Sequence, residues 1–105
     1  MTTFDKREEA FEKKFAHDQD LRFKAMARRN KMLGLWAAEQ LGLQGPAAET
    51  YALTVVAADM TTKGEEDVFA KIRKDLDAGK ISDHLIRAYM AEMLDKARAQ
   101  LRAGG

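Results

Sequence analysis

Apolar residues recur along most of the chain at the three- and four-residue spacing of an amphipathic α-helix. The longest such series lies near the end of the sequence and comprises Leu85, Ile86, Tyr89, Met90, Met93, Leu94, Ala97 and Leu101. Shorter series of the same kind lie within residues 48–56 and 68–76. Apolar and polar residues do not alternate over the length of a strand, so the pattern predicts an all-α protein.

Three short breaks, which contain glycines and the only proline, divide this helical pattern. They fall at residues 42–46, 61–64 and 78–82. The segments between them predict four helices, at residues 3–41, 46–61, 65–78 and 82–102. Gly79 is expected to end the third helix in a left-handed conformation. Because the connections are short, neighbouring helices should run antiparallel and form a compact four-helix bundle.

The first helical segment is too long to belong wholly to such a bundle. A helix of 39 residues spans roughly 58 Å, which exceeds the width of a domain of this size. Its apolar residues are sparse at first and become dense only from Met32 to Leu41. We therefore expect residues 1–20 to form a mobile or projecting N-terminal helical arm and residues 21–105 to form the four-helix bundle.

The expected arm carries a line of three phenylalanines. Phe4, Phe11 and Phe15 fall within about 40° of one another on a helical wheel. Charged residues surround this line, among them Asp5, Arg7, Glu8, Glu12, Lys13 and Lys14. A line this narrow cannot hold a core, but it suits a groove on another protein. We predict that the phenylalanines anchor the arm and that the charged residues form ion pairs with the partner. The alternative, that the phenylalanines continue the bundle, is disfavoured by length, because the shorter helices cannot cover the first one.

Composition excludes several classes of protein and of site. The chain has no cysteine, which removes disulfides and thiolate chemistry, and its formal net charge is +1. A balance this even gives no pull toward nucleic acid. The longest nearly apolar run, residues 51–58, is too short to span a bilayer. With no apolar signal core at the N-terminus either, we expect a cytoplasmic protein without direct membrane insertion.

The polar residues show no catalytic or metal-binding arrangement. His17 and His84 are the only histidines, and neither has a ligand partner at metal-binding spacing on its own helix. Ser82 is the only serine, and it is expected to cap the last helix rather than to act as a nucleophile. We therefore predict neither an enzyme nor a bound metal or cofactor.

A small-ligand site remains an open alternative at two places. Asp59 lies on the apolar edge of the second helix, where it would form a salt bridge or hydrogen bond, or else contact a ligand. Lys80 and Ser82 precede the last helix, whose N-terminus attracts anions weakly. These three residues are the candidates for weak binding of a small ligand such as an adenine nucleotide.

Four stretches of the sequence carry a resemblance to a known family. They are residues 4–15 (FDKREEAFEKKF), 23–31 (FKAMARRNK), 35–38 (LWAA) and 64–68 (GEEDV). In these stretches, and in its last helix, the chain resembles the zeta-subunit inhibitors of the F-type ATP synthase found in alphaproteobacteria. The likeness covers essentially the whole chain.

The resemblance implies an inhibitor of ATP hydrolysis. It implies that the N-terminal arm enters the catalytic head of the ATP synthase between alpha and beta subunits, beside the rotating gamma subunit, and blocks rotation in the hydrolysing direction. Its partners would be these three subunits, and we expect the free protein to be a monomer. Two other functions stay open from the sequence: a helical bundle that binds a small ligand, and a generic helical adaptor whose arm docks elsewhere.

Overall fold

The protein folds into four α-helices in the part of the chain that the structure describes. The computed structural model describes the backbone of residues 2–59 and 64–104, and the side chains of residues 19–59 and 64–104. The helices are α1 (Thr2–Gln40), α2 (Pro46–Ala58), α3 (Gly64–Asp75) and α4 (Asp83–Arg102). No strand occurs in the described ranges. The all-α, four-helix prediction is confirmed.

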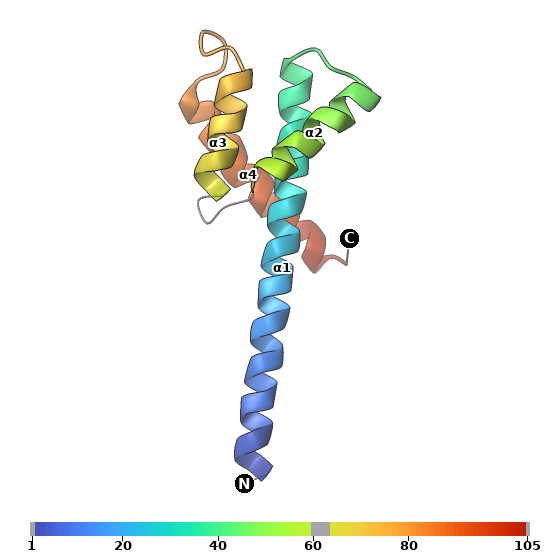
Figure 1. Ribbon diagram of the computed structural model, residues 1–105, viewed down its shortest axis with the longest axis vertical. Helices are drawn as coiled ribbons and strands as arrows, with labels where there is room; N and C mark the ends of the chain where they lie inside the picture. The colour runs from blue at the N-terminus through green and yellow to red at the C-terminus, as the bar shows by residue number, and fades with distance from the viewer. Residues whose placement is uncertain (1, 60–63, 105) are drawn as a thin grey trace.

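α1 projects far beyond the other three helices. Figure 1 shows its N-terminal half, in blue, extending away from the rest of the molecule. With this projection included, the molecule measures 63 Å along its longest axis and 26 and 20 Å along the other two. Among the described side chains, the first buried one along α1 is Ala25. Leu21 is 37% exposed and Phe23 is 74% exposed. The projecting arm expected from the thin apolar content is therefore present, while the boundary between residues 20 and 21 stays a prediction.

The core forms where the second half of α1 crosses the other helices. It is built by Leu33, Ala37, Val55, Val68, Ile72, Leu76, Ile86 and Met90. At the crossing of α1 and α2, a Cβ added to Gly34 would lie only 2.7 Å from the Cα of Ala52. Trp36 of α1 stacks on Tyr89 of α4 with ring centroids 4.5 Å apart. Small residues thus allow the backbones of α1 and α2 to approach closely, and aromatic stacking packs α1 against α4.

The turn between α1 and α2 follows the glycines that the sequence pattern marked. The Leu43 N–H donates to the Ala38 carbonyl at 2.9 Å, and Gly42 has a φ of 76°. This is the Schellman arrangement, which needs a left-handed residue just after the helix. Gly45, with a φ of 56°, precedes Pro46 at the start of α2.

α2 ends earlier than predicted. The prediction extended α2 to residue 61, but Asp59 already has non-helical dihedral angles and donates its N–H to the Val56 carbonyl, three residues back. Ala58 is therefore the last helical residue. The remainder of the predicted end, at residues 60 and 61, lies outside the described residues.

α3 also ends early, at Asp75, and the prediction of a left-handed stop at Gly79 is wrong. Within the described residues, the glycines with positive φ are Gly42, Gly45 and Gly104. The side chain of Asp77 accepts the Gly79 N–H at 2.8 Å, and the Asp77 carbonyl accepts the Ile81 N–H at 2.9 Å. Because an aspartate side chain closes this turn, no left-handed residue is required.

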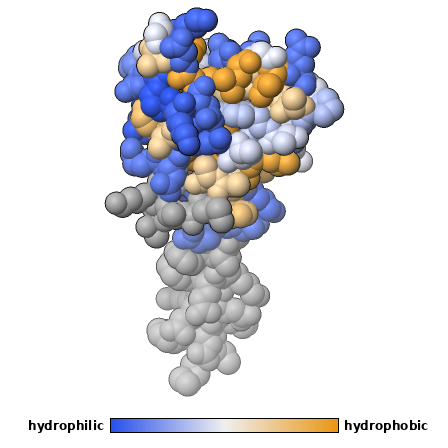
Figure 2. Space-filling view, turned by 45° about the horizontal axis from the view of Figure 1, so that its top comes forward, coloured by the Kyte–Doolittle hydropathy of each residue, from blue (hydrophilic) through white to orange (hydrophobic). Residues whose placement is uncertain are grey.

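The face of the bundle drawn in Figure 2 has apolar patches among hydrophilic side chains. Figure 2 shows these patches as orange areas among blue ones. The most exposed large apolar side chains are Phe23, at 74%, and Leu53, at 60%. No helix in the described part of the chain is long and apolar enough to cross a membrane.

Candidate protein-binding surface

The residues predicted to bind a partner all lie on the projecting part of α1. They are Phe4, Asp5, Arg7, Glu8, Phe11, Glu12, Lys13, Lys14 and Phe15, within the helix Thr2–Gln40. Their side chains lie outside the described ones, so their contacts stay a prediction. The backbone of the arm continues into the docked half of α1 as one helix.

A buried polar network holds α1 where the arm meets the bundle. Arg29 and Asn30 are each only 1% exposed. The Arg29 guanidinium donates from Nε to Asn30 Oδ1 at 2.7 Å and from Nη1 and Nη2 to the Glu65 carboxylate at 3.3 and 2.5 Å. Asn30 Nδ2 donates in turn to Asp59 Oδ2 at 3.0 Å. The network therefore ties α1 to the end of α2 and the start of α3.

Gly64 leaves room for the Asp59 carboxylate at the start of α3. A Cβ added to Gly64 would overlap the Asp59 carboxylate. A carboxylate beside a helix N-terminus is favoured by the helix dipole. Asp59 therefore makes the bundle-edge hydrogen bond considered for it from the sequence, and a role for it in ligand binding stays a prediction.

Sequence analysis did not identify this network, although a signal was available. Ala25, Arg29, Leu33 and Ala37 recur every four residues, so Arg29 occupies a core position of α1. An arginine in an apolar stripe needs a buried partner, because an unpaired buried charge is costly. Periodicity could have shown that need, but not which carboxylate meets it, since Glu65 lies 36 residues away.

The other two small-ligand candidates lie at the opposite end of α3 from Asp59. Ser82 Oγ accepts the Leu85 N–H at 3.1 Å and caps α4 as predicted. Lys80 is exposed in the preceding turn. α3 has 12 residues and so is roughly 18 Å long. The structure therefore does not bring Asp59 together with Lys80 and Ser82, and within the described residues no cluster of three or more His, Asp or Glu side chains suits a metal.

A second polar cluster joins α2 to the end of α3. The Tyr51 hydroxyl donates to Asp75 Oδ2 at 2.9 Å, and Lys71 Nζ lies 2.7 Å from the same oxygen. Burial and the hydrogen bond to Asp75 raise the pKa of Tyr51 well above its ordinary value. Burial of Asp75 raises the pKa of its carboxyl, but hydrogen bonds from Lys71 and Tyr51 and the charges of Lys71 and Lys74 outweigh this and lower that pKa. This cluster fastens the bundle together.

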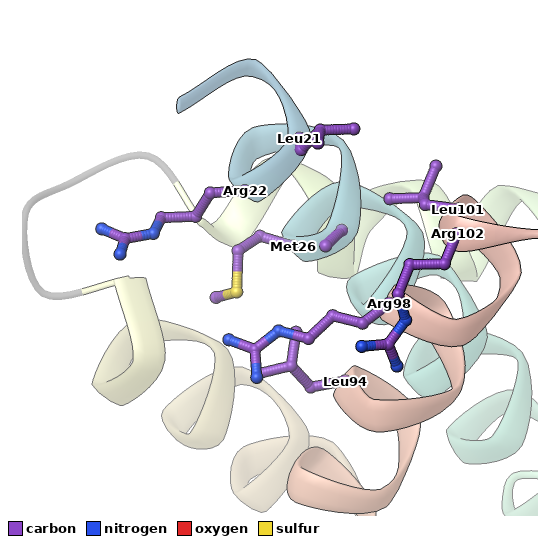
Figure 3. A pocket seen from close by; sticks show the side chains of 8 residues that line it. Leu21, Arg22, Met26, Leu94, Arg98, Leu101 and Arg102 are labelled. Carbon is purple, nitrogen blue, oxygen red and sulfur yellow. The ribbon is translucent and has the colours of Figure 1, made fainter. Parts of the chain in front are cut away.

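A groove lies beside the base of the arm, between α1 and the end of α4. Its volume is about 290 Å³, and we call it the α1–α4 groove. It is lined by Leu21, Arg22, Ala25, Met26, Leu94, Arg98, Leu101 and Arg102. Figure 3 shows Arg98 and Arg102 extending along the α4 side, while Arg22 extends from α1. Sequence analysis did not predict this groove, because its two walls lie about 70 residues apart in the chain.

A comparison with known protein families identifies the family of this chain. The model of the family described as ATPase inhibitor subunit zeta matches residues 1–100, which include the arm and nearly all of the bundle. The chain belongs to the ATPase inhibitor subunit zeta family. A search of curated proteins finds no match.

Membership of the zeta family confirms the resemblance found in the sequence. A zeta-family protein is a regulatory protein and not an enzyme, and its partner is the ATP synthase.

Proposed function

We propose that this zeta-family protein inhibits ATP hydrolysis by inserting the N-terminal arm of α1 into the catalytic head of the F-type ATP synthase. The arm enters between alpha and beta subunits, beside the gamma subunit, and blocks rotation in the hydrolysing direction. The observation that carries the proposal is the projection of α1 from the bundle, in a chain whose family match includes the arm.

The proposed insertion depends on the difference in width between the arm, which is a single helix, and the bundle. Nineteen residues of helix, residues 2–20, extend roughly 28 Å at 1.5 Å per residue. The other helices pack on α1 only from about Ala25 onward. The bundle is too wide to follow a single helix into a narrow cleft, so it stops insertion at the base of the arm. The network around Arg29 holds α1 against the bundle and keeps this stop in place.

Aromatic anchors provide the binding energy in this proposal. Phe4, Phe11 and Phe15 share one side of the arm, and buried aromatic residues dominate the energetics of many interfaces. Arg7, Lys13 and Lys14 face acidic groups of the synthase, while Asp5, Glu8, Glu9 and Glu12 face basic ones. Rim charges of this kind set the specificity and the association rate more than the affinity.

The test is inhibition of ATP hydrolysis by a variant in which the anchors are shortened and the arm is kept. The double substitution Phe11→Ala and Phe15→Ala should raise the concentration needed for half inhibition by at least about tenfold, because each lost anchor contributes roughly 1 kcal/mol or more. Leu53→Ala is the control, since Leu53 is an exposed apolar residue on α2, away from the arm. Equal inhibition by the wild-type chain and the double variant would contradict the proposal.

Weak nucleotide binding by the bundle is a separate proposal with less support. It places an adenine nucleotide near Asp59, or near Lys80 and Ser82. Adding ADP to the isotope-labelled protein should then shift amide resonances around one of these two places. Unchanged resonances at millimolar ADP would remove it, without affecting the inhibitor proposal.

A further inference from the structure

The α1–α4 groove combines the exposed positive charges of Arg98 and Arg102 with an apolar floor at the base of the arm. We propose that this groove docks an acidic amphipathic segment of the ATP synthase catalytic head, as a second contact beside the inserted arm. The inference rests on the proposed function, which gives the protein its partner.

Charge is the first argument for this occupant. The lining contains three arginines and no acidic residue. Of the other described arginines, Arg29, Arg73 and Arg87 pair with carboxylates, whereas Arg28 donates to Gln100. Among the described residues, Arg98 and Arg102 of the groove form no ion pair with a carboxylate, whereas Arg22 also lines a neighbouring hollow that contains Asp59 and Glu65. A guanidinium pairs best with a carboxylate in bidentate geometry, so the charge of the groove favours an acidic occupant.

The floor and size of the groove indicate that the occupant is a protein segment. Leu21, Met26, Leu94 and Leu101 form the apolar part of the lining. Pockets that enclose drug-sized ligands have volumes of roughly 300–1,000 Å³, and this groove, at about 290 Å³, is just below that range. It accommodates one or two large apolar side chains. An amphipathic helix with carboxylates beside its apolar stripe presents that combination.

The groove lies at the base of the arm, so a partner that binds the arm would also be near the groove. Leu21 and Arg22 lie in the last exposed turn of α1 before the helix becomes buried at Ala25. A segment at the mouth of the cleft that receives the arm would therefore reach the groove. Arg28 Nη1 donates to Gln100 Oε1 at 3.4 Å, and Ala97 is fully buried, so α1 and α4 are held together before any partner binds.

Charge reversal on the rim tests the docking. Arg98 and Arg102 are exposed, so Arg98→Glu with Arg102→Glu should leave the thermal unfolding temperature nearly unchanged. The double variant should need roughly tenfold more protein for half inhibition of ATP hydrolysis by the isolated catalytic head. The matched control is Lys80→Glu with Lys96→Glu, which changes the net charge equally at exposed positions that do not line the groove and removes only the exposed Lys96–Glu92 pair.

Each outcome of this measurement has a definite meaning. Weakened inhibition by the groove variant alone supports the docking. Inhibition by the groove variant as strong as that of the wild-type chain overturns the groove and leaves the inhibitor function standing. Equal weakening of both double variants also overturns it, since the effect would then follow net charge. Absence of inhibition by every protein, the wild-type chain included, overturns the function and the groove together.

A cross-link identifies the occupant. The chain has no cysteine, so Ala103→Cys, just beyond Arg102, accepts a benzophenone maleimide at one defined position. Irradiation of the complex should join it to a peptide of the catalytic head with acidic residues beside apolar ones. A cross-link to a second copy of this chain, or to a peptide without acidic residues, would overturn the proposed occupant.

Discussion

Arg29 and Glu65, which lie 36 residues apart in the sequence, form a two-pronged ion pair that joins α1 to the first turn of α3, with N–O distances of 3.3 and 2.5 Å. The guanidinium is buried, whereas 52% of the Glu65 side chain is exposed. The pair is therefore asymmetric: loss of the carboxylate would leave a charge that water reaches only poorly.

This asymmetry predicts a large difference between two adjacent glutamates. Glu65→Ala should lower the free energy of unfolding by about 2 kcal/mol, less than the ~3–5 kcal/mol for a fully buried pair because Glu65 is half exposed. Glu66→Ala removes only an exposed pair with Arg87 and should cost at most about 1 kcal/mol. Urea unfolding of the two variants measures both values. Similar values for the two would show that burial of Arg29 does not govern the pair.

The close crossing of α1 and α2 predicts that Gly34 resists even a small substitution. The added Cβ of Gly34→Ala would meet Ala52 backbone, which cannot rotate away. We expect a net loss of about 1–2 kcal/mol, since overpacking outweighs the better helix propensity of alanine. Gly79→Ala is the control, because its nearest contact is 3.3 Å away and its φ is not positive. Thermal unfolding that ranks Gly79→Ala as the more damaging change would contradict this interpretation.

The Tyr51–Asp75 hydrogen bond predicts a pH-dependent contribution to stability. Tyr51→Phe should lower the free energy of unfolding by about 1–2 kcal/mol at pH 7, because the bond has a charged acceptor. The folded-state pKa of Asp75 is lowered, so its contribution is present above its ordinary pKa of 3.8 and is lost as pH falls further. The folded-state pKa of Tyr51 is raised, so its contribution is complete below pH 10 and declines above it.

Unfolding by urea at pH 3, 7 and 10.5 measures this dependence. The difference between the wild-type protein and Tyr51→Phe should be largest at pH 7 and smaller at both extremes. A difference that stays constant over this range would show that the hydroxyl does not act through the titration of these two groups.

Local patterns in the sequence predicted those features of the fold that depend on nearby residues. Ser82 caps α4 as expected, because its partner, the Leu85 N–H, is three residues away. The Gly79 prediction failed for an equally local reason: the Asp77 side chain supplies the hydrogen bond that closes the turn. The conformation of this turn thus depends on Asp77, which the prediction from Gly79 alone did not consider.

Features assembled from distant segments could not be read from the sequence. The partners of Arg29 and Asn30 come from the ends of α2 and α3, and their positions depend on how the helices cross. The α1–α4 groove likewise exists only because residues near 22 and near 98 lie side by side. The projecting arm was predictable from the sequence, because a long helix with few apolar residues has no apolar face to bury against a core.

The most direct test of the central claim is ATP hydrolysis by the isolated catalytic head of the cognate synthase, measured with the full chain and with a chain lacking residues 1–18. The shortened chain keeps the described core and the network around Arg29, and an unchanged helical circular dichroism melt would verify this. We predict inhibition by the full chain and none by the shortened one. Equal inhibition by both would contradict insertion of the arm and would locate the inhibitory surface in the bundle.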